Sequence, residues 1–339
     1  MSFDLNTLWF LLIAVLFTGF FFLEGFDYGV GILLPFVAKN DKERRMVINT
    51  IGPHWDGNEV WLLTAGGAIF AAFPNWYATL FSGFYLALFL ILFGLIVRGV
   101  AFEFRSKDDN PLWRKTWDTA IFVGSLLPAL LWGVAFANIV RGVPIDGSMT
   151  FTGNLFTLLN PFSLLGGLVT LTLFTLHGAL FLSLKASDVV LERVQAMLNW
   201  LWIPVLVLIL AFVGFSIIET DLFEGFSLVQ GIGLGLAVVA LLTAVYTIRQ
   251  QQYGRAFIGT GLTIIGTVAF LFSGLFPRVM PSSLGSEFDL TIYNASSSPY
   301  TLKIMSIVAL IFVPIVLIYQ GWSYWVFRKR VTLESQLEY

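Results

Sequence analysis

The stretch PHWDGNEVW, residues 53–61, holds the densest group of ionisable side chains in the sequence. It brings His54, Asp56 and Glu59 together directly before an apolar run. Residues three positions apart lie on the same face of a helix, so Asp56 and Glu59 would be neighbours. Carboxyl and imidazole groups accept and release protons, so the stretch indicates a proton path. The alternative is a helix start at which an acid such as Asp56 is favoured by the helix dipole.

Two more acids lie inside the first apolar segment, where EGFDYGVG contains Glu24 and Asp27. They too are three residues apart, and charged side chains at such depth usually face a protein interior or a water-filled cavity. The connection to the next apolar segment is short. We therefore expect both acids to cluster with the ionisable residues of PHWDGNEVW, as four carboxyl groups and one imidazole. The alternative is a first helix that ends near residue 23 and leaves both acids in a turn.

A basic residue, Arg98, follows about 20 mostly apolar residues of another segment. An Arg at this position needs a counter-ion or must extend its side chain to the membrane surface. Asp27 and Glu103 are the partners we expect at that depth. Asp118 opens the following segment and is interpreted as one more acid at a helix N-terminus.

Histidine and cysteine usage limits the metal chemistry that the chain can support. The sequence has no Cys and two His, His54 and His177, in different segments. Thiolate ligands are therefore excluded, and no HxxxH or ExxH spacing is present. His177, in the apolar stretch TLFTLHGALFL, is typical of a buried histidine with satisfied hydrogen bonds. We expect this chain to ligate neither haem nor any other metal.

The composition indicates what solvent surrounds these residues. Hydrophobic residues make up 57% of the 339 residues and charged residues 12%, with a mean hydropathy of +0.83. Apolar runs of roughly 20 residues recur, which is the length that crosses a bilayer. The chain is therefore expected to be a single polytopic membrane domain over residues 1–339. Its first apolar run lacks a basic leader and a cleavage site, so we interpret it as a retained helix. The dispersed basic residues argue against nucleic-acid binding.

Nine membrane spans can be placed along the sequence. Their approximate bounds are 7–36, 54–73, 77–98, 117–140, 160–184, 200–218, 228–248, 257–276 and 301–327. With this number of spans, all but three of the 19 Lys and Arg residues fall on one side, the exceptions being Arg141, Arg278 and Lys303. Basic residues favour the cytoplasmic side, so the N-terminus is predicted outside and the C-terminus inside.

Two functions remain open on the residues alone. A row of Asp, Glu and His entering a helix bundle is typical of a proton-handling membrane protein or of a subunit of one. The rival is a stand-alone proton-coupled secondary transporter. That class usually shows inverted repeats and paired broken helices near the midplane, and neither is convincing here.

Long stretches of the sequence resemble one known family, subunit II of the cytochrome bd-type quinol oxidases. The matching stretches cover nearly the whole chain and are EGFDYGVG (24–31), ERRMVINTIGPHWDGNEVWLLTAGGAIFAAFP (43–74), FSGFYLALFLILFGLIVRGVAFEFRS (81–106), RKTWD (114–118), GVAFANIVRGVP (133–144), TGNLFTLLNPFSLLGGL (152–168) and MPSS (280–283). The resemblance is weakest over residues 185–276.

The resemblance implies a fold of two four-helix bundles plus one peripheral helix. It implies a pseudo-symmetric heterodimer with a haem-bearing subunit I, which holds two b-type haems and one haem d, in a bacterial cytoplasmic membrane. Such a complex oxidises quinol and reduces oxygen to water, and it generates membrane potential without pumping further protons. Many such complexes include a very small hydrophobic extra subunit, and some members hold a structural quinone on subunit II.

The same resemblance implies roles for the ionisable residues. Asp56 would be the carboxylate of a proton channel at the subunit interface, with Glu24 beside it and His54 and Glu59 in the same path. Many relatives have Asp where this chain has Glu24, which keeps the charge and lengthens the side chain. Asp27, Arg98 and Glu103 would form an ion-pair network that encloses a cation and is structural rather than catalytic.

Overall fold

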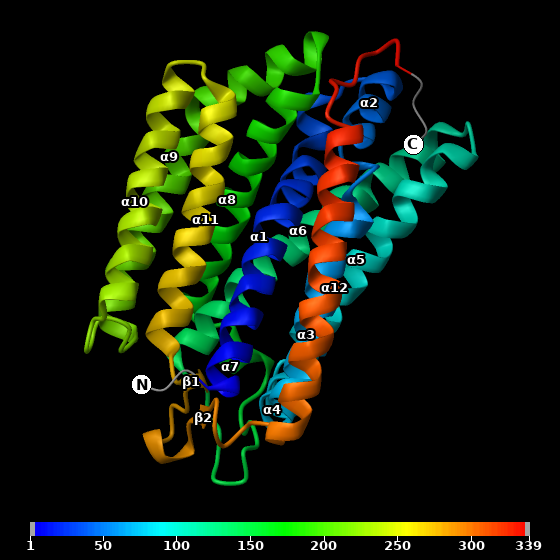
Figure 1. The fold of residues 1–339 in the computed structure, drawn as a ribbon. Helices are drawn as coiled ribbons and strands as arrows, with labels where there is room; N and C mark the ends of the chain where they lie inside the picture. The colour runs from blue at the N-terminus through cyan, green and yellow to red at the C-terminus, as the bar shows by residue number, and fades with distance from the viewer. Residues whose placement is uncertain (1–3, 336–339) are drawn as a thin grey trace.

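The computed structural model describes residues 4–335, and these fold into a bundle of long helices (Figure 1). The predicted domain 1–339 extends beyond this range at residues 1–3 and 336–339, which lie outside the described part. The helices are α1 (Leu5–Val37), α2 (Asp41–Ile51), α3 (Trp55–Ala72), α4 (Pro74–Gly83), α5 (Tyr85–Phe104), α6 (Pro111–Arg141), α7 (Leu155–Leu158), α8 (Pro161–Lys185), α9 (Asp188–Glu219), α10 (Leu228–Arg249), α11 (Tyr253–Leu275) and α12 (Pro299–Val326).

Several of these helices begin where an Asn or Ser cap precedes a proline. The Asn110, Asn160 and Ser298 side chains each accept a backbone N–H from the first turn of α6, α8 and α12, respectively. In all three helices the next residue is proline, whose fixed φ suits the first helical position. The short polar side chains therefore fix where each long apolar segment starts.

Eight of the described helices are long and apolar enough to cross a membrane: α1, α5, α6, α8, α9, α10, α11 and α12. The remaining predicted span, 54–73, corresponds to α3, which begins with the polar residues WDGNE and falls below this measure. The predicted span 77–98 covers parts of two helices, because the helical conformation is interrupted at Phe84 between α4 and α5. The amphipathic helix α2 lies in the short connection between the first two predicted spans.

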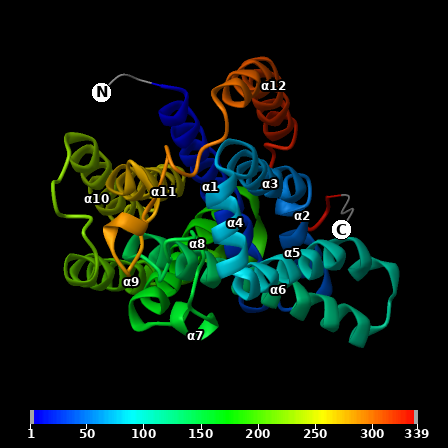
Figure 2. The ribbon, with the colours of Figure 1, turned by 90° about the horizontal axis from the view of Figure 1, so that it is seen from below.

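Helix α1 is the centre of the bundle and contacts α3, α6, α8, α11 and α12 (Figure 2). Its closest approach is to α8, where a Cβ added at Gly29 would lie 2.0 Å from the backbone oxygen of Phe174 and 2.8 Å from the Cα of Gly178. Small residues allow such close helix contacts in lipid. By contrast, α12 stands at the edge, and only 6% of its most apolar window is buried.

The connections divide between the two ends of the bundle (Figure 1). One end holds α2, the turns from α5 to α6, α8 to α9 and α10 to α11, and the segment after α12, and these parts contain most of the basic residues. The other end holds α4, α7 and a small antiparallel hairpin of β1 (Arg278–Met280) and β2 (Leu290–Thr291). Most of the basic residues therefore lie at the end of the bundle that contains α2.

Candidate functional site

Glu24 and Asp27 lie inside a continuous helix. Helix α1 runs without a break from Leu5 to Val37, so the alternative of an early end near residue 23 is wrong. Both side chains are fully buried. They share one face of α1 and lie in the half of that helix nearer α2. Two acids at this depth require partners from neighbouring helices.

Arg98 of α5 is the main partner, and it is itself fully buried. Its Nη2 donates to Oε1 of Glu24 and, over 2.7 Å, to Oε1 of Glu59 on α3. The guanidinium lies 4.8 Å from the centre of the Tyr28 ring, which adds a cation–π contact. Arg98 therefore joins α1, α3 and α5 through charge.

Asp27 is held by a different group, the side-chain amide of Asn58. The Nδ2 of Asn58 donates to Oδ2 of Asp27 over 2.7 Å, and both residues are fully buried. Asp27 also lies within electrostatic reach of Arg98 and Glu59. The expected pairing of Arg98 with Asp27 and Glu103 is therefore replaced by pairing with Glu24 and Glu59.

Glu103 lies away from this cluster because of helix geometry. It is five residues from Arg98 on α5, which places the two side chains about 140° apart around the helix axis. Glu103 is exposed, and among residues 4–335 the acids that pair with Arg98 are Glu24 and Glu59.

Asp56 and His54 also lie outside the buried cluster. Asp56 is exposed on the outer face of α3, where its Oδ1 accepts only the adjacent Gly57 N–H at 2.7 Å, which is not a capping bond. His54 precedes α3 as its N-cap residue, without a side-chain capping bond. Its ring stacks on Tyr324 of α12, with centroids 4.1 Å apart. The four acids and the imidazole thus share one end of the bundle, but only Glu24, Asp27 and Glu59 converge.

Unpartnered polar atoms show what this cluster can do. In the described part of the chain, Glu24 Oε2, Asp27 Oδ1, Tyr28 Oη, and Nε and Nη1 of Arg98 are buried without a hydrogen-bond partner. Buried polar atoms are nearly always paired, often with ordered water. Glu24 and Glu59 share one guanidinium, Asp27 lies beside them on Asn58, and Glu24 and Asp27 each keep an oxygen without a partner. Such a cluster can hold a proton and exchange it with a neighbouring acid or a water molecule.

A second ionic network, which sequence reasoning missed, ties α2 to α6. Asp118 accepts from Arg44 at 2.7 Å and from Nε of Arg105 at 2.6 Å. Arg105 also pairs with Asp41 at 2.8 Å, and Asp41 with Arg114 at 2.9 Å. Because α6 begins at Pro111 and has no acid in its first turn, Asp118 lies inside the helix, and its interpretation as an acid at a helix N-terminus is wrong. The pattern of Asp and Arg in DKERR and RKTWD was the available signal, because oppositely charged residues gather at the same end of the bundle.

His177 is a buried histidine with both ring nitrogens satisfied, as predicted. Its Nδ1 lies 2.7 Å from the Thr260 hydroxyl and its Nε2 lies 3.2 Å from the backbone oxygen of Phe22. The ring stacks on Phe257 at 4.4 Å. Within residues 4–335, no group of three or more His, Cys, Asp or Glu side chains is arranged to hold a metal ion.

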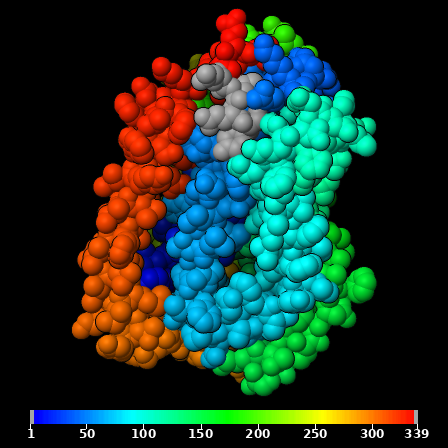
Figure 3. Space-filling model, turned by 90° about the vertical axis from the view of Figure 1, so that its right-hand side faces the viewer, coloured from blue at the N-terminus to red at the C-terminus, as the bar shows by residue number. Residues whose placement is uncertain are grey.

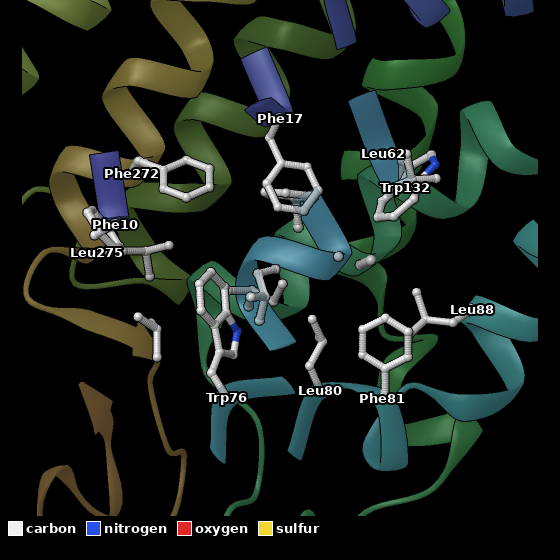
Figure 4. A pocket seen from close by; sticks show the side chains of 16 residues that line it. Phe10, Phe17, Leu62, Trp76, Leu80, Phe81, Leu88, Trp132, Phe272 and Leu275 are labelled. Carbon is white, nitrogen blue, oxygen red and sulfur yellow. The ribbon is translucent and has the colours of Figure 1, made fainter. Parts of the chain in front are cut away.

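Two cavities lie deeper in the bundle, and both are apolar. The smaller has a volume of about 50 Å³ and lies among Phe17, Trp76 and Trp132 (Figure 4). The larger, about 140 Å³, lies between α6 and α8 to α11, with Phe212 and Leu241 in its wall. Neither is lined by Glu24, Asp27 or Glu59, which together with Arg98 we call the Arg98 cluster.

Large apolar side chains are exposed along α3 and α5. In Figure 3, α3 lies between α12 on one side and α5 on the other. Leu63 and Phe70 of α3 are 69% and 61% exposed, and Phe93 and Ile96 of α5 are each 55% exposed. Asp56 lies at one end of this face, which we call the α3/α5 face. Exposed large apolar side chains of this kind contact lipid or another membrane subunit.

Comparisons with known proteins agree with one another. The family model described as cytochrome bd terminal oxidase subunit II matches residues 5–327. The chain is 47% identical over 336 residues to cytochrome bd ubiquinol oxidase subunit 2 of Bacillus subtilis, with 99% of each chain covered. It is 38% identical over 367 residues to cytochrome bd-I ubiquinol oxidase subunit 2 of Escherichia coli K12, covering 98% and 96% of the two chains. The fold is similar to the structure of bd oxidase from Geobacillus thermodenitrificans, with a TM-score of 0.75, 18% identity, and 96% and 99% of the two chains covered.

Proposed function

The chain belongs to the cytochrome bd terminal oxidase subunit II family, and from this premise we propose that its buried acids deliver protons for oxygen reduction in the partner subunit. Family membership makes the chain a subunit of a bacterial membrane quinol oxidase, an oxidoreductase complex that contains haem and a subunit I. The alternative of a stand-alone secondary transporter is therefore wrong. The proposal concerns which residues of this chain serve the reaction.

The proposed topology takes α3 as the ninth crossing. The N-terminus then lies outside and the C-terminus in the cytoplasm, with two four-helix bundles and α12 as the peripheral helix. The gathering of basic connections at one end of the bundle supports this orientation. It places the Arg98 cluster toward the cytoplasmic side, the side from which protons for oxygen reduction are taken.

The proton path begins at Asp56 on the exposed end of α3. Glu59 is three residues further along the same helix and contacts Arg98, which in turn contacts Glu24. A proton passes along this row when one carboxyl group releases it and the next accepts it, so the net charge of the row is unchanged after each transfer. Arg98 keeps the buried acids from accumulating uncompensated negative charge. His54, stacked on Tyr324, lies at the mouth of the path and completes the proposed set.

The haems, two b-type and one haem d in this proposal, are held by subunit I and supply electron transfer and oxygen activation. Residues of this chain bind none of them and act only by holding and moving protons. The observation that carries the proposal is the buried cluster itself: three carboxyl groups around one arginine, two of them with a free oxygen.

The α3/α5 face is proposed as the surface that subunit I covers. It is apolar along its length and carries the exposed Asp56 at its cytoplasmic end. Docking there would bury Asp56 at the boundary of the two subunits, where a proton path must cross from one chain to the other. The very small extra subunit is also part of the proposal, and mass spectrometry of the gently purified complex tests for it.

The larger cavity is proposed to hold an apolar ligand of the quinone class. Its walls are almost entirely aliphatic and aromatic, with Thr170, Ser216, Thr263 and Thr267 as the few polar residues that line it. Solvent extraction of the purified complex tests this proposal. Two quinone pools are expected, one that exchanges with added quinol and one that is lost when Leu234→Trp fills the cavity.

The central experiment replaces Asp56 by Asn in the assembled, fully haem-loaded complex. Positioned proton-transfer groups typically contribute about a hundredfold or more in rate, so we expect quinol-driven oxygen uptake per haem to fall at least about tenfold. Glu192→Gln is the matched control, because Glu192 is also an exposed acid at the same end of the bundle, on α9. Equal turnover and equal proton uptake in the Asp56 and control variants would refute the relay role. Loss of haem before loss of turnover per haem would assign Asp56 a structural role instead.

A further inference from the structure

The peripheral helix α12 reaches the buried acid cluster through a chain of hydrogen bonds. Nε1 of Trp61 donates to Oε1 of Gln320 at 2.9 Å, and Nε2 of Gln320 donates to Oδ1 of Asn58 at 3.3 Å. Nδ2 of Asn58 then donates to Asp27. Tyr324, one turn beyond Gln320, adds a second donor to Oδ1 of Asn58 at 2.8 Å.

The two ends of this chain fix its direction. The indole of Trp61 can only donate a hydrogen bond, and an ionised carboxylate such as Asp27 can only accept one. The two amides between them must therefore run head to tail. Gln320 has to turn its oxygen to Trp61 and its nitrogen to Asn58. Asn58 has to turn its oxygen to α12 and its nitrogen to Asp27.

This direction distinguishes the two oxygens of Asp27. Oδ2 accepts the Asn58 amide N–H, and this hydrogen bond stabilises negative charge on that oxygen, so a proton binds more readily at Oδ1. Oδ1 is buried and has no partner in the described part of the chain. Glu24, on the same face of α1, has the same asymmetry, because Arg98 holds Oε1 while Oε2 is unpartnered.

From this arrangement we infer that Gln320 and Tyr324 of α12 are positioning residues for proton transfer, which act through Asn58 to leave Oδ1 as the exchanging oxygen of Asp27. The inference rests on the proposed proton path and adds Asp27 to it. A proton leaves Oε2 of a protonated Glu24 and binds Oδ1 of an ionised Asp27, so one carboxylic acid and one carboxylate are present before and after. Helix α12 is thus part of the site, although few of its residues are buried.

Several charged and titratable groups face Asp27 and must be kept constant in any test. They are Glu24 on α1, Glu59 on α3, Arg98 on α5 and Tyr324 on α12. A useful variant therefore removes the donors to Asn58 without adding a charge. Tyr324→Phe with Gln320→Met meets this condition, because both replacements are neutral and of similar size.

The test measures oxygen uptake per haem, the quinol KM and the pH profile of turnover in the assembled complex. The double variant is expected to lose about tenfold in kcat and to shift its pH profile, because Asn58 is then no longer held with its amide N–H on Oδ2 of Asp27. The quinol KM should not change, since quinol binds elsewhere in the complex. Tyr319→Phe is the matched control, because the same hydroxyl group is lost from an exposed position on the same helix.

A kcat and a pH profile equal to those of Tyr319→Phe would overturn the inference. Should the double variant fail to assemble, Tyr324→Phe alone leaves only the longer Gln320 bond and is expected to show a smaller change, about twofold. Wild-type behaviour of that variant would then overturn the inference as well. Glu24→Gln separates this question from the proton path: if it leaves turnover unchanged, the path itself is wrong, whatever α12 does.

Discussion

Replacing Arg98 by Gln should strongly destabilise the subunit. The guanidinium serves Glu24 and Glu59 together, and both Arg98 and Glu24 are shielded from solvent. Removing one partner of a buried ion pair costs about 3–5 kcal/mol, because the other partner is left charged and unpaired. The cation–π contact with Tyr28 is also lost, which adds about 1 kcal/mol. The neutral amide of Gln recovers part of this by donating to one carboxylate. A net loss of about 4 kcal/mol follows.

Replacing Glu59, one of the two acids paired with Arg98, should destabilise the subunit less. Glu59→Gln leaves Arg98 bound to Glu24, and the Glu59 side chain is already 20% exposed. A loss of about 1–2 kcal/mol is expected. In the Arg98→Gln background, Glu59→Gln should instead recover stability, because it removes one of the stranded acids. A double-mutant cycle of these variants therefore gives a coupling energy of opposite sign to the cost of either change.

The assay is the half-life of the purified complex at a fixed elevated temperature, followed by haem absorbance and size-exclusion chromatography. A rate is the appropriate measure, because membrane complexes of this size rarely unfold reversibly. Two results would refute the reasoning: an Arg98→Gln complex as long-lived as the wild type, or additive effects of the two substitutions. Either would mean that the buried charges are not paired as described.

Three further predictions concern packing, His177 and pH. Gly29→Ala should prevent assembly or cost more than about 3 kcal/mol, because its Cβ would meet the backbone of α8, whereas Gly235→Ala on α10 has open space and should be tolerated in the same thermal assay. His177→Phe should keep the full haem spectrum and cost about 1 kcal/mol, because the Thr260 hydroxyl can still donate to the Phe257 oxygen at 3.0 Å; a bleached complex would contradict this prediction. Although burial raises the pKa of Glu43, the hydrogen bonds from the Lys39 N–H, Arg193 and Asn40 outweigh it and hold the pKa below its ordinary value of 4.5. The stability that these hydrogen bonds contribute is fully present above pH 4.5 and is lost as the pH falls through the lowered pKa. Glu43→Gln should therefore cost about 1–2 kcal/mol at pH 6 and progressively less below pH 4.5. A stability difference between the wild type and this variant that grows on acidification would count against this assignment.

The membrane character and most helix positions could be predicted from the sequence, because long apolar runs and caps such as Asn160-Pro161 are local signals. Helix α2 was missed because its 11 residues are amphipathic and too short to resemble a span. The break at Phe84 was missed although Ser82 and Gly83, a pair typical of turns, directly precede it. The Asn40 side chain that caps α2 was likewise a local signal.

The sequence predicted most of the ionisable residues of the candidate site, but not which of them interact. Depth in the membrane suggested Asp27 and Glu103 as partners of Arg98, but depth says nothing about rotation around a helix axis. Five residues of helix turn Glu103 away, and periodicity alone could have shown this. The sequence does not show that Asn58 holds Asp27. It also does not show that Gln320 and Tyr324 contact Asn58 from over 260 positions away, because that contact depends on where α12 packs.

The most direct test of the central claim is proton uptake from the cytoplasmic side during a single turnover of the haem-loaded complex carrying Glu24→Gln. The account predicts that electron transfer from quinol to the haems proceeds normally, while the uptake that accompanies oxygen reduction slows by at least about tenfold. Proton uptake at the wild-type rate, in a complex with full haem content, would contradict the claim that this subunit's buried acids deliver the protons.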